Sequence, residues 1–347
     1  KREELYMTNK VFYSAAARAL KNGEDTRIYM IIEGENAGEK ALVADKLLVQ
    51  NEGMKGFWQE CINSFASEKL PTEKAFACGR VFAEELTHSP RLVICGGGHV
   101  AVPLASIASL LNFEVTVLDD RPEFANKERF PTAQHIICKP FAEGLACVEE
   151  RSNTYYVIIT RGHSADLECL RLILKRPFAY CGMIGSRHKV AVVMNQMEKE
   201  GYANALLNRV HSPIGLRIGA ETPAEIAVCI AAEMVQVCHK ELSEGTLPDA
   251  MLEALISPTQ PMVMALLVKK SGSAPRGAGA RMLVLQDGTV LGSVGGGAGE
   301  AELCKVALEV LADRKPRIIE CNMTNNDAQK SGMVCGGTIT AFLEPVF

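Results

Sequence analysis

Residues 91–101 read RLVICGGGHVA. A short apolar run ends at Cys95, three glycines follow, and a helical stretch continues from Val102 to Leu111. The pattern G-x-G-x-x-[G/A] is met by Gly96, Gly98 and Ala101. Such glycines allow a tight turn and let an anion approach the backbone at the start of a helix. Because the glycines lie between a strand and a helix, this stretch predicts a Rossmann-like unit.

The next apolar run, residues 114–118, leads into Asp119, Asp120 and Arg121. Asp119 lies about 20 residues beyond the glycines, where a dinucleotide-binding fold carries the acid that binds a ribose. Asp120 is close enough to take that role instead. A second interpretation stays open, in which the fold keeps its turn and uses it for another ligand or for none.

Further strand-like runs at 134–138, 155–160 and 179–184 alternate with helical stretches. This alternation predicts an α/β fold with a doubly wound, parallel, Rossmann-like sheet, which we place at residues 91–245. Ligands of such sheets bind beyond the carboxyl ends of the strands. The loops that follow the strands are therefore the candidate site.

Cationic and titratable residues gather in these loops: His99, Arg161, His163, Arg187, His188 and Glu221. Histidine can move protons, ligate a metal or bind an anion, and arginine suits phosphate or carboxylate. The alternative is that these side chains cap helices or face water. For Glu221 that alternative is an acid near a helix start, with Thr222 as an N-cap before Pro223.

The two ends of the chain resemble one another. Residues 28–53 and 263–288 align without a gap, each as an apolar strand, a loop of small residues and a second strand closed by an acid–glycine turn. A helical stretch precedes each copy. We therefore predict a smaller α+β domain in two copies, degenerate at residues 1–90 and intact at residues 246–347.

The second copy carries the chemistry-bearing residues. Successive glycines at a helix start form a nest of N–H groups suited to phosphate, and the copy has them at Gly295, Gly296 and Gly297. Ser273 and Arg276 add a hydroxyl and a guanidinium, whereas the first copy has acids in the matching loop. Cys335 is either a buried small residue or a thiolate near a metal or sulfur ligand.

Composition narrows the class of protein. The 347 residues carry a formal charge of −4, and 48% of them are hydrophobic. Basic runs are absent, which argues against nucleic-acid binding, and the apolar runs are too short for a membrane span. None of the 12 cysteines forms a C-x-x-C pair, which favours a reducing cytoplasm.

Several motifs resemble those of the XdhC/CoxI family of xanthine dehydrogenase accessory proteins. The motifs, all present in the printed sequence, are SGSAPR (271–276), GARMLV (279–284), GSVGGG (292–297), GMVCGG (332–337), CGGGHVA (95–101), VLDDRPEFA (117–125), TRGHSAD (160–166), GMIGSRHK (182–189) and IGAETPAEIAV (218–228). The resemblance covers about 91–230 and 261–347. Two features depart from the family pattern: the GSVGGG domain follows the Rossmann-like domain, a permuted order, and Ala298 replaces a common Cys.

The resemblance implies an accessory or maturation factor. Such a factor binds the molybdenum cofactor, as molybdopterin or its dinucleotide, shields it while a cysteine desulfurase partner supplies sulfur, and delivers it to a molybdenum hydroxylase client. Cys335 would then offer soft sulfur to molybdenum. Two other hypotheses stay open: an NAD(P)-dependent oxidoreductase that uses Gly96, Gly98 and Asp119, and a partner-binding protein without catalysis. A strand edge left unpaired in the first copy suggests a homodimer.

Overall fold

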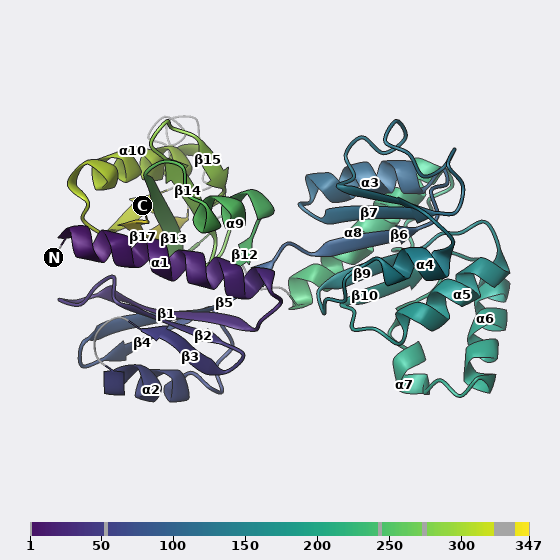
Figure 1. Cartoon of the computed structure of the whole chain (residues 1–347), viewed down its shortest axis with the longest axis horizontal. Helices are drawn as coiled ribbons and strands as arrows, with labels where there is room; N and C mark the ends of the chain where they lie inside the picture. Colours follow the sequence, from purple (N-terminus) through teal and green to yellow (C-terminus); the bar gives the residue numbers. More distant parts are fainter. Residues whose placement is uncertain (1, 52–54, 242–244, 273–275, 323–336, 347) are drawn as a thin grey trace. The chain divides into compact units, whose positions relative to one another are not determined.

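The computed structural model describes residues 2–51, 55–241, 245–272, 276–322 and 337–346 (Figure 1). The chain divides into two compact units: a central unit, Ser89–Glu241, and a flanking unit built from Lys1–His88 together with Leu242–Phe347. The two terminal segments therefore share one unit, whereas the sequence analysis treats them as two separate domains.

The central unit holds a six-stranded parallel sheet with the order β8-β7-β6-β9-β10-β11. Numbered within the unit, this order is 3-2-1-4-5-6, as in dinucleotide-binding folds. The predicted Rossmann-like sheet is confirmed. The elements are β6 (Arg91–Cys95), α3 (Ala101–Leu110), β7 (Glu114–Asp119), β8 (His135–Cys138), α4 (Phe141–Ala146), β9 (Thr154–Ile158), α5 (His163–Ile173), β10 (Tyr180–Met183), α6 (Arg187–Lys199), α7 (Asn204–Leu207), β11 (Val210–His211) and α8 (Pro223–Glu241).

Both faces of this sheet are covered, which explains why its strands are nearly continuous apolar runs. Side chains alternate along β6, so that Leu92 and Ile94 pack in one core with residues of α3 and α8. Val93 and Cys95 point the other way and pack with residues of α4, α5 and α6. The glycine loop follows β6 directly, so the core fixes its position at the carboxyl edge of the sheet.

The flanking unit holds two sheets of similar plan, one mixed and one wholly antiparallel among the described strands. One has the order β12-β5-β1-β2-β3, with β4 also paired to β5, and the other has the order β15-β14-β13-β17-β16. Its elements are α1 (Arg2–Lys21), β1 (Thr26–Glu33), β2 (Lys40–Ala44), β3 (Leu47–Asn51), α2 (Lys55–Ser64), β4 (Thr72–Phe76), β5 (Gly79–His88), β12 (Thr246–Leu247), α9 (Asp249–Ile256), β13 (Met262–Ser271), β14 (Arg281–Leu285), β15 (Val290–Gly292), α10 (Gly297–Asp313), β16 (Arg317–Asn322) and β17 (Thr338–Pro345).

One core joins the two sheets of the flanking unit. It combines residues of α1 and α9 with the facing sides of β1 and β13, represented by Met30 and Leu266. Figure 1 shows α1 running between the two sheets of this unit. The outer face of each sheet has its own helix, α2 over Tyr29 and Ile31 and α10 over the second sheet.

The gap-free alignment of the two ends is wrong in detail. It places Leu48 of β3 opposite Leu283 of β14, yet the strand paired to β1 is β2 and the strand paired to β13 is β14. Leu42, on β2, is therefore the counterpart of Leu283. The loop after β13 is longer than the loop after β1, so an alignment without a gap matches β14 to β3 instead of β2. The error is not visible in the sequence because β2 and β3 are similar in composition.

None of the helices in the described ranges has the length and apolarity to cross a membrane.

Candidate functional site

The glycine loop packs against the end of the neighbouring strand. Gly96 has φ +117°, and a Cβ there would lie 2.4 Å from the carbonyl oxygen of Ile159. A Cβ on Gly97 would lie 2.2 Å from the carbonyl oxygen of Phe124, whereas a Cβ on Gly98 would meet nothing within 4 Å. The first two glycines are thus required by close packing. Only Gly98 borders open space.

Asp119 holds this loop. The side chain is buried, and its Oδ2 accepts the N–H of Gly97 at 2.8 Å. Arg121 donates its backbone N–H (3.1 Å) and its Nε (2.9 Å) to Oδ1, and its Nη2 (3.0 Å) to Oδ2. Burial alone would raise the pKa of Asp119, but the bonds from Arg121 and Gly97 hold that pKa below its usual value. The ionised carboxylate therefore already uses about four acceptor positions.

Two guanidinium groups contact the adjacent aspartates, Arg121 at Asp119 and Arg161 at Asp120. Arg121 lies over the ring of Phe124, with its Cζ 3.6 Å from the ring centroid. Asp120 lies 3.8 Å from Arg121 and 3.1 Å from Arg161. The side chain of Arg161 stays 59% exposed. The aspartates therefore hold two cations at the carboxyl end of β7, and one of them remains open to solvent.

A third cation is held nearby by a residue that the sequence analysis did not choose. Asp166, fully buried in α5, accepts the hydroxyl of Thr160 at 2.6 Å and pairs with the ammonium of Lys189. Gly96 and Thr160 are close neighbours, since a Cβ on the glycine would lie 3.1 Å from the Cα of Thr160. Asp166 ends the motif TRGHSAD after β9, and Lys189, which lies after β10, ends the motif GMIGSRHK. Their positions in these motifs could have indicated both residues from the sequence.

The remaining candidates of these loops are solvent-facing. His99, His163, Arg187 and His188 are exposed, and within the described ranges their side chains make no hydrogen bond or ion pair. The structure thus brings together the glycines, Asp119 and Arg161. It leaves the three histidines free to meet a ligand or water.

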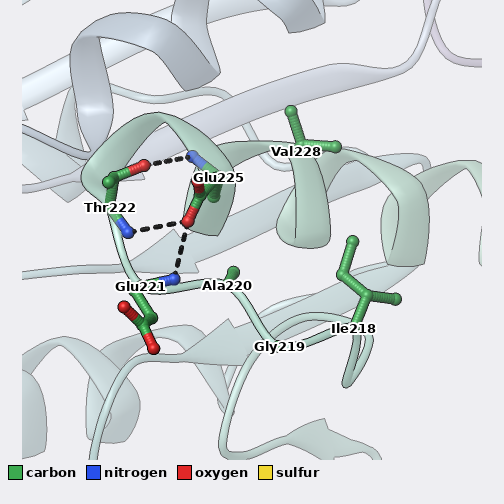
Figure 2. A pocket seen from close by; sticks show the side chains of 7 residues that line it. All are labelled: Ile218, Gly219, Ala220, Glu221, Thr222, Glu225 and Val228. Atoms are coloured by element: carbon green, nitrogen blue, oxygen red, sulfur yellow. Dashed lines mark hydrogen bonds between the residues drawn. The ribbon is translucent and has the colours of Figure 1, made fainter.

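Glu221 borders a hollow of about 410 Å³ at the start of α8, lined by Ile218, Gly219, Ala220, Glu221, Thr222, Glu225 and Val228. The carboxylate of Glu225 accepts the N–H groups of Glu221 (2.8 Å) and Thr222 (3.0 Å), and the hydroxyl of Thr222 accepts the N–H of Glu225 at 3.3 Å (Figure 2). This is a capping box, and Thr222 is confirmed as the N-cap. The bonds from Thr222 and Glu221 lower the pKa of Glu225.

The second glycine loop is occupied by the chain itself. One carboxylate oxygen of Glu300 accepts the N–H groups of Val294 and Gly296, both at 3.1 Å, and the hydroxyl of Ser293 at 2.8 Å. The N–H of Gly295 donates to the Ser293 hydroxyl at 3.1 Å. Of the three predicted glycines, Gly296 donates to this internal carboxylate and Gly295 donates to Ser293, while Val294 supplies the second backbone donor. The use of this nest for a ligand stays a prediction.

The other candidate residues of the C-terminal copy provide less evidence for a binding site. Arg276 is partly buried, and Gly297 is exposed at the start of α10. Ser273 and Cys335 lie outside the described residues. In the part of the chain that the structure describes, His, Cys, Asp and Glu side chains do not gather in a group of three that could hold a metal.

Two protein-family models match parts of the chain. Residues 92–234 match the family model of the XdhC Rossmann domain, and residues 255–322 match that of the XdhC and CoxI family. The first match covers the sheet with its glycine loop and cation-bearing loops. The second contains the Glu300 nest.

Two curated proteins and one solved structure are similar. An uncharacterised protein, YqeB, of Escherichia coli K12 is 36% identical over 149 residues, which are 43% of this chain and 27% of that protein. A probable xanthine dehydrogenase subunit from Bacillus subtilis 168 is 29% identical over 156 residues, 45% of each chain. A crystal structure of a xanthine dehydrogenase from Bacillus halodurans matches with 25% identity and a TM-score of 0.54, covering 69% of this chain and 66% of that one.

The chain thus spans less than half the length of the curated relatives it matches. The two family models nevertheless fall on the two regions that carry its glycine loops, in the order Rossmann domain first. The chain belongs to the XdhC and CoxI family.

Proposed function

We propose that the chain is an accessory factor of a xanthine dehydrogenase-type molybdenum hydroxylase. It binds the molybdenum cofactor in the cytoplasm, supports its sulfuration by a cysteine desulfurase, and assists its insertion into the client enzyme. Membership of the XdhC and CoxI family supports the accessory role. The cofactor, the desulfurase and the predicted homodimer are parts of the proposal.

The observation that carries the proposal is the set of cations at the carboxyl edge of the central sheet. Arg121, Arg161 and Lys189 each have an aspartate partner, which fixes the cation in place without leaving a net negative edge. A pterin with a phosphate or a dinucleotide is an anion, and arginine binds phosphate by charge-assisted, bidentate bonds. Gly98, which borders open space, allows such a group to approach the backbone.

The residues of this edge fit the phosphate part of the cofactor. Arg161 would hold the phosphate, and His163, at the start of α5, is exposed beside it in sequence. The cofactor, when bound, supplies the molybdenum centre that the client needs. Cys335, a soft ligand for that centre, remains the proposed contact for the molybdenum.

A retention experiment tests the proposal. The purified chain is mixed with cofactor released from a molybdenum hydroxylase and passed through gel filtration, and molybdenum is measured in the protein peak. Arg161→Ala is expected to lower the retained molybdenum about tenfold, the effect of losing one charge-assisted contact. Arg171→Ala is the matched control, because Arg171 lies in the last turn of α5, the helix that follows Arg161, and pairs with Glu200 at 2.7 Å. Absence of molybdenum from the parent peak would contradict the proposal.

The nicotinamide-dependent alternative has the strand order and the glycine turn in its favour. Against it, Asp119 has its acceptor positions filled by Gly97 and Arg121, so a ribose diol finds no free carboxylate there. We expect no micromolar binding of NADH in a fluorescence titration of the parent. Micromolar binding that is lost in Asp119→Asn would favour the oxidoreductase.

A further inference from the structure

The flanking unit consists of two halves with one plan. In the N-terminal half, residues 2–88, the order is helix, three strands, helix and two strands; the C-terminal half, from α9 to β17, repeats it. The strand order is also the same, with β4-β5-β1-β2-β3 in one sheet matching β16-β17-β13-β14-β15 in the other. Both central strands carry a register shift at the same place, after Ile31 in β1 and after Leu267 in β13.

The register shift fixes which residues are counterparts. Aligning the two shifts makes Met30 the counterpart of Leu266. Met30 pairs with Lys40 across the sheet and Leu266 pairs with Arg281, so Lys40 and Arg281 occupy one position.

The other neighbour of each central strand gives a second position. Ile28 pairs with Glu84, and Met264, its counterpart, pairs with Glu344. Glu84 and Glu344 are therefore equivalent as well. Each half presents one cation and one acid at matching places of its inner face.

These four side chains pair across the halves. Lys40 donates to Glu344 at 2.9 Å, and Arg281 pairs with Glu84. All four side chains are at most 3% exposed. The cation of each half thus binds the acid of the other half, which is the reciprocal pattern of an isologous dimer interface, where residue i meets j and j meets i.

We infer that the flanking unit is an internal dimer: residues 2–88 occupy the place of a second copy of the C-terminal half. The apolar surroundings follow the same rule, since Leu42 and Leu283, and Phe82 and Phe342, are counterparts that lie together in the shared core. The N-terminal half is therefore kept as a partner surface. This gives the half a role although its sequence has no counterpart of GSVGGG, so the half need not be regarded as degenerate, and the inference does not depend on the proposed function.

Charge reversal in the full chain tests the reciprocal pairing. K40E sets two acids against each other at the Glu344 site, and we expect the urea midpoint of this unit to fall by about 1 M. K40E/E344K reverses one cross-half pair and is expected to recover part of that loss. K40E/E84K also changes two charges, but both lie in one half and both pairs break, so its midpoint falls below that of K40E. Equal midpoints for the two double variants would overturn the inference.

A cut chain tests the partner role. A protease site is placed between Glu241 and Gly245, and the folded full-length protein is cleaved there. The piece that begins near Gly245 is expected to co-elute with the rest, and the unfolding midpoint of this unit becomes dependent on protein concentration, as for a dimer. Cleaved K40E/E84K is expected to separate into two pieces. Separation of the cleaved parent, or an unchanged cleaved K40E/E84K, would overturn the inference.

Discussion

The two glycine loops, residues 96–98 and 295–297, each donate a backbone N–H group to an internal carboxylate, and they differ in the acid that accepts it. In the central unit the acid is Asp119, which is buried on the next strand and fixed by the guanidinium of Arg121. In the flanking unit the acid is Glu300, which is partly buried in the first turn of α10. No basic side chain pairs with Glu300 in the ranges that the structure describes.

This difference makes the carboxylate of Asp119 a permanent part of its loop, whereas a ligand anion could replace the carboxylate of Glu300. Removing Asp119 takes the buried acceptor away from the partly buried guanidinium of Arg121 and from the N–H of the buried Gly97. Glu300 can move into water, because it lies near the surface, and a ligand anion can then take over its donors. A glycine-rich nest can therefore bind a ligand only when displacing its internal carboxylate costs little free energy.

The largest expected effect comes from Asp119. Asp119→Ala should lower the free energy of unfolding of the central unit by about 3 kcal/mol, because it leaves Arg121 and Gly97 without their buried acceptor. Asp120→Ala is the matched control, since its side chain is 33% exposed, and surface pairs contribute at most about 1 kcal/mol. Hydrogen exchange of the β6 and β7 amides measures both. Equal losses of unfolding free energy in the two variants would show that the carboxylate of Asp119 is not a permanent part of the glycine loop.

Acid should remove the same contribution. The bonds from Arg121 and Gly97, which outweigh the effect of burial, lower the pKa of Asp119 in the folded protein, so its share of stability is present above the unfolded value of about 4 and is lost as pH falls through the folded pKa. Asp119→Asn should therefore show a weaker loss of stability than the parent between pH 4 and the folded pKa. Urea melts across this range measure the difference. A parallel pH profile for the two proteins would contradict the assignment.

The central fold could be predicted from the sequence because its strands are buried on both faces and read as apolar runs. The runs at 91–95 and 114–118 became β6 and β7, with β7 one residue longer. The register of the flanking sheets could not be predicted, since β2 and β3 are similar apolar strands separated by a two-residue turn. The pairing of β2 with β1 shows that β2, and not β3, matches β14.

The sequence predicts where the site residues lie in the fold, but not which hydrogen bonds and ion pairs they form. The position of Asp119 followed from the motif, whereas the direction of Arg121 depends on packing against Phe124. Asp166 and Lys189 come from different loops, and their burial is a tertiary property. Glu300 had a visible signal, an acid four residues after Gly296, but a single sequence does not show that its side chain turns back.

Glu300 should respond to anions where Asp119 does not. Glu300→Ala frees the donors of Ser293, Val294 and Gly296 and should cost the flanking unit about 2 kcal/mol for three lost hydrogen bonds. Inorganic phosphate should then raise the melting temperature of the variant more than that of the parent. Glu302→Ala is the control on the same helix, an exposed acid paired with Lys305 at 3.3 Å. If phosphate stabilises all three proteins equally, the nest is not an exchangeable site.

At the start of α8 an internal carboxylate also accepts backbone N–H groups, but these come from Glu221 and Thr222 and not from glycines. There Glu225 accepts two N–H groups, and the hydroxyl of Thr222 returns one bond (Figure 2). Thr222→Ala should lower the free energy of unfolding by about 1 kcal/mol, the usual contribution of an N-cap, while Thr222→Ser keeps most of it. Phosphate should not compensate for the loss, because the carboxylate of Glu225 remains on its donors. Compensation by phosphate in Thr222→Ala would mean that surface position alone, and not the release of the internal acid, decides whether an anion enters.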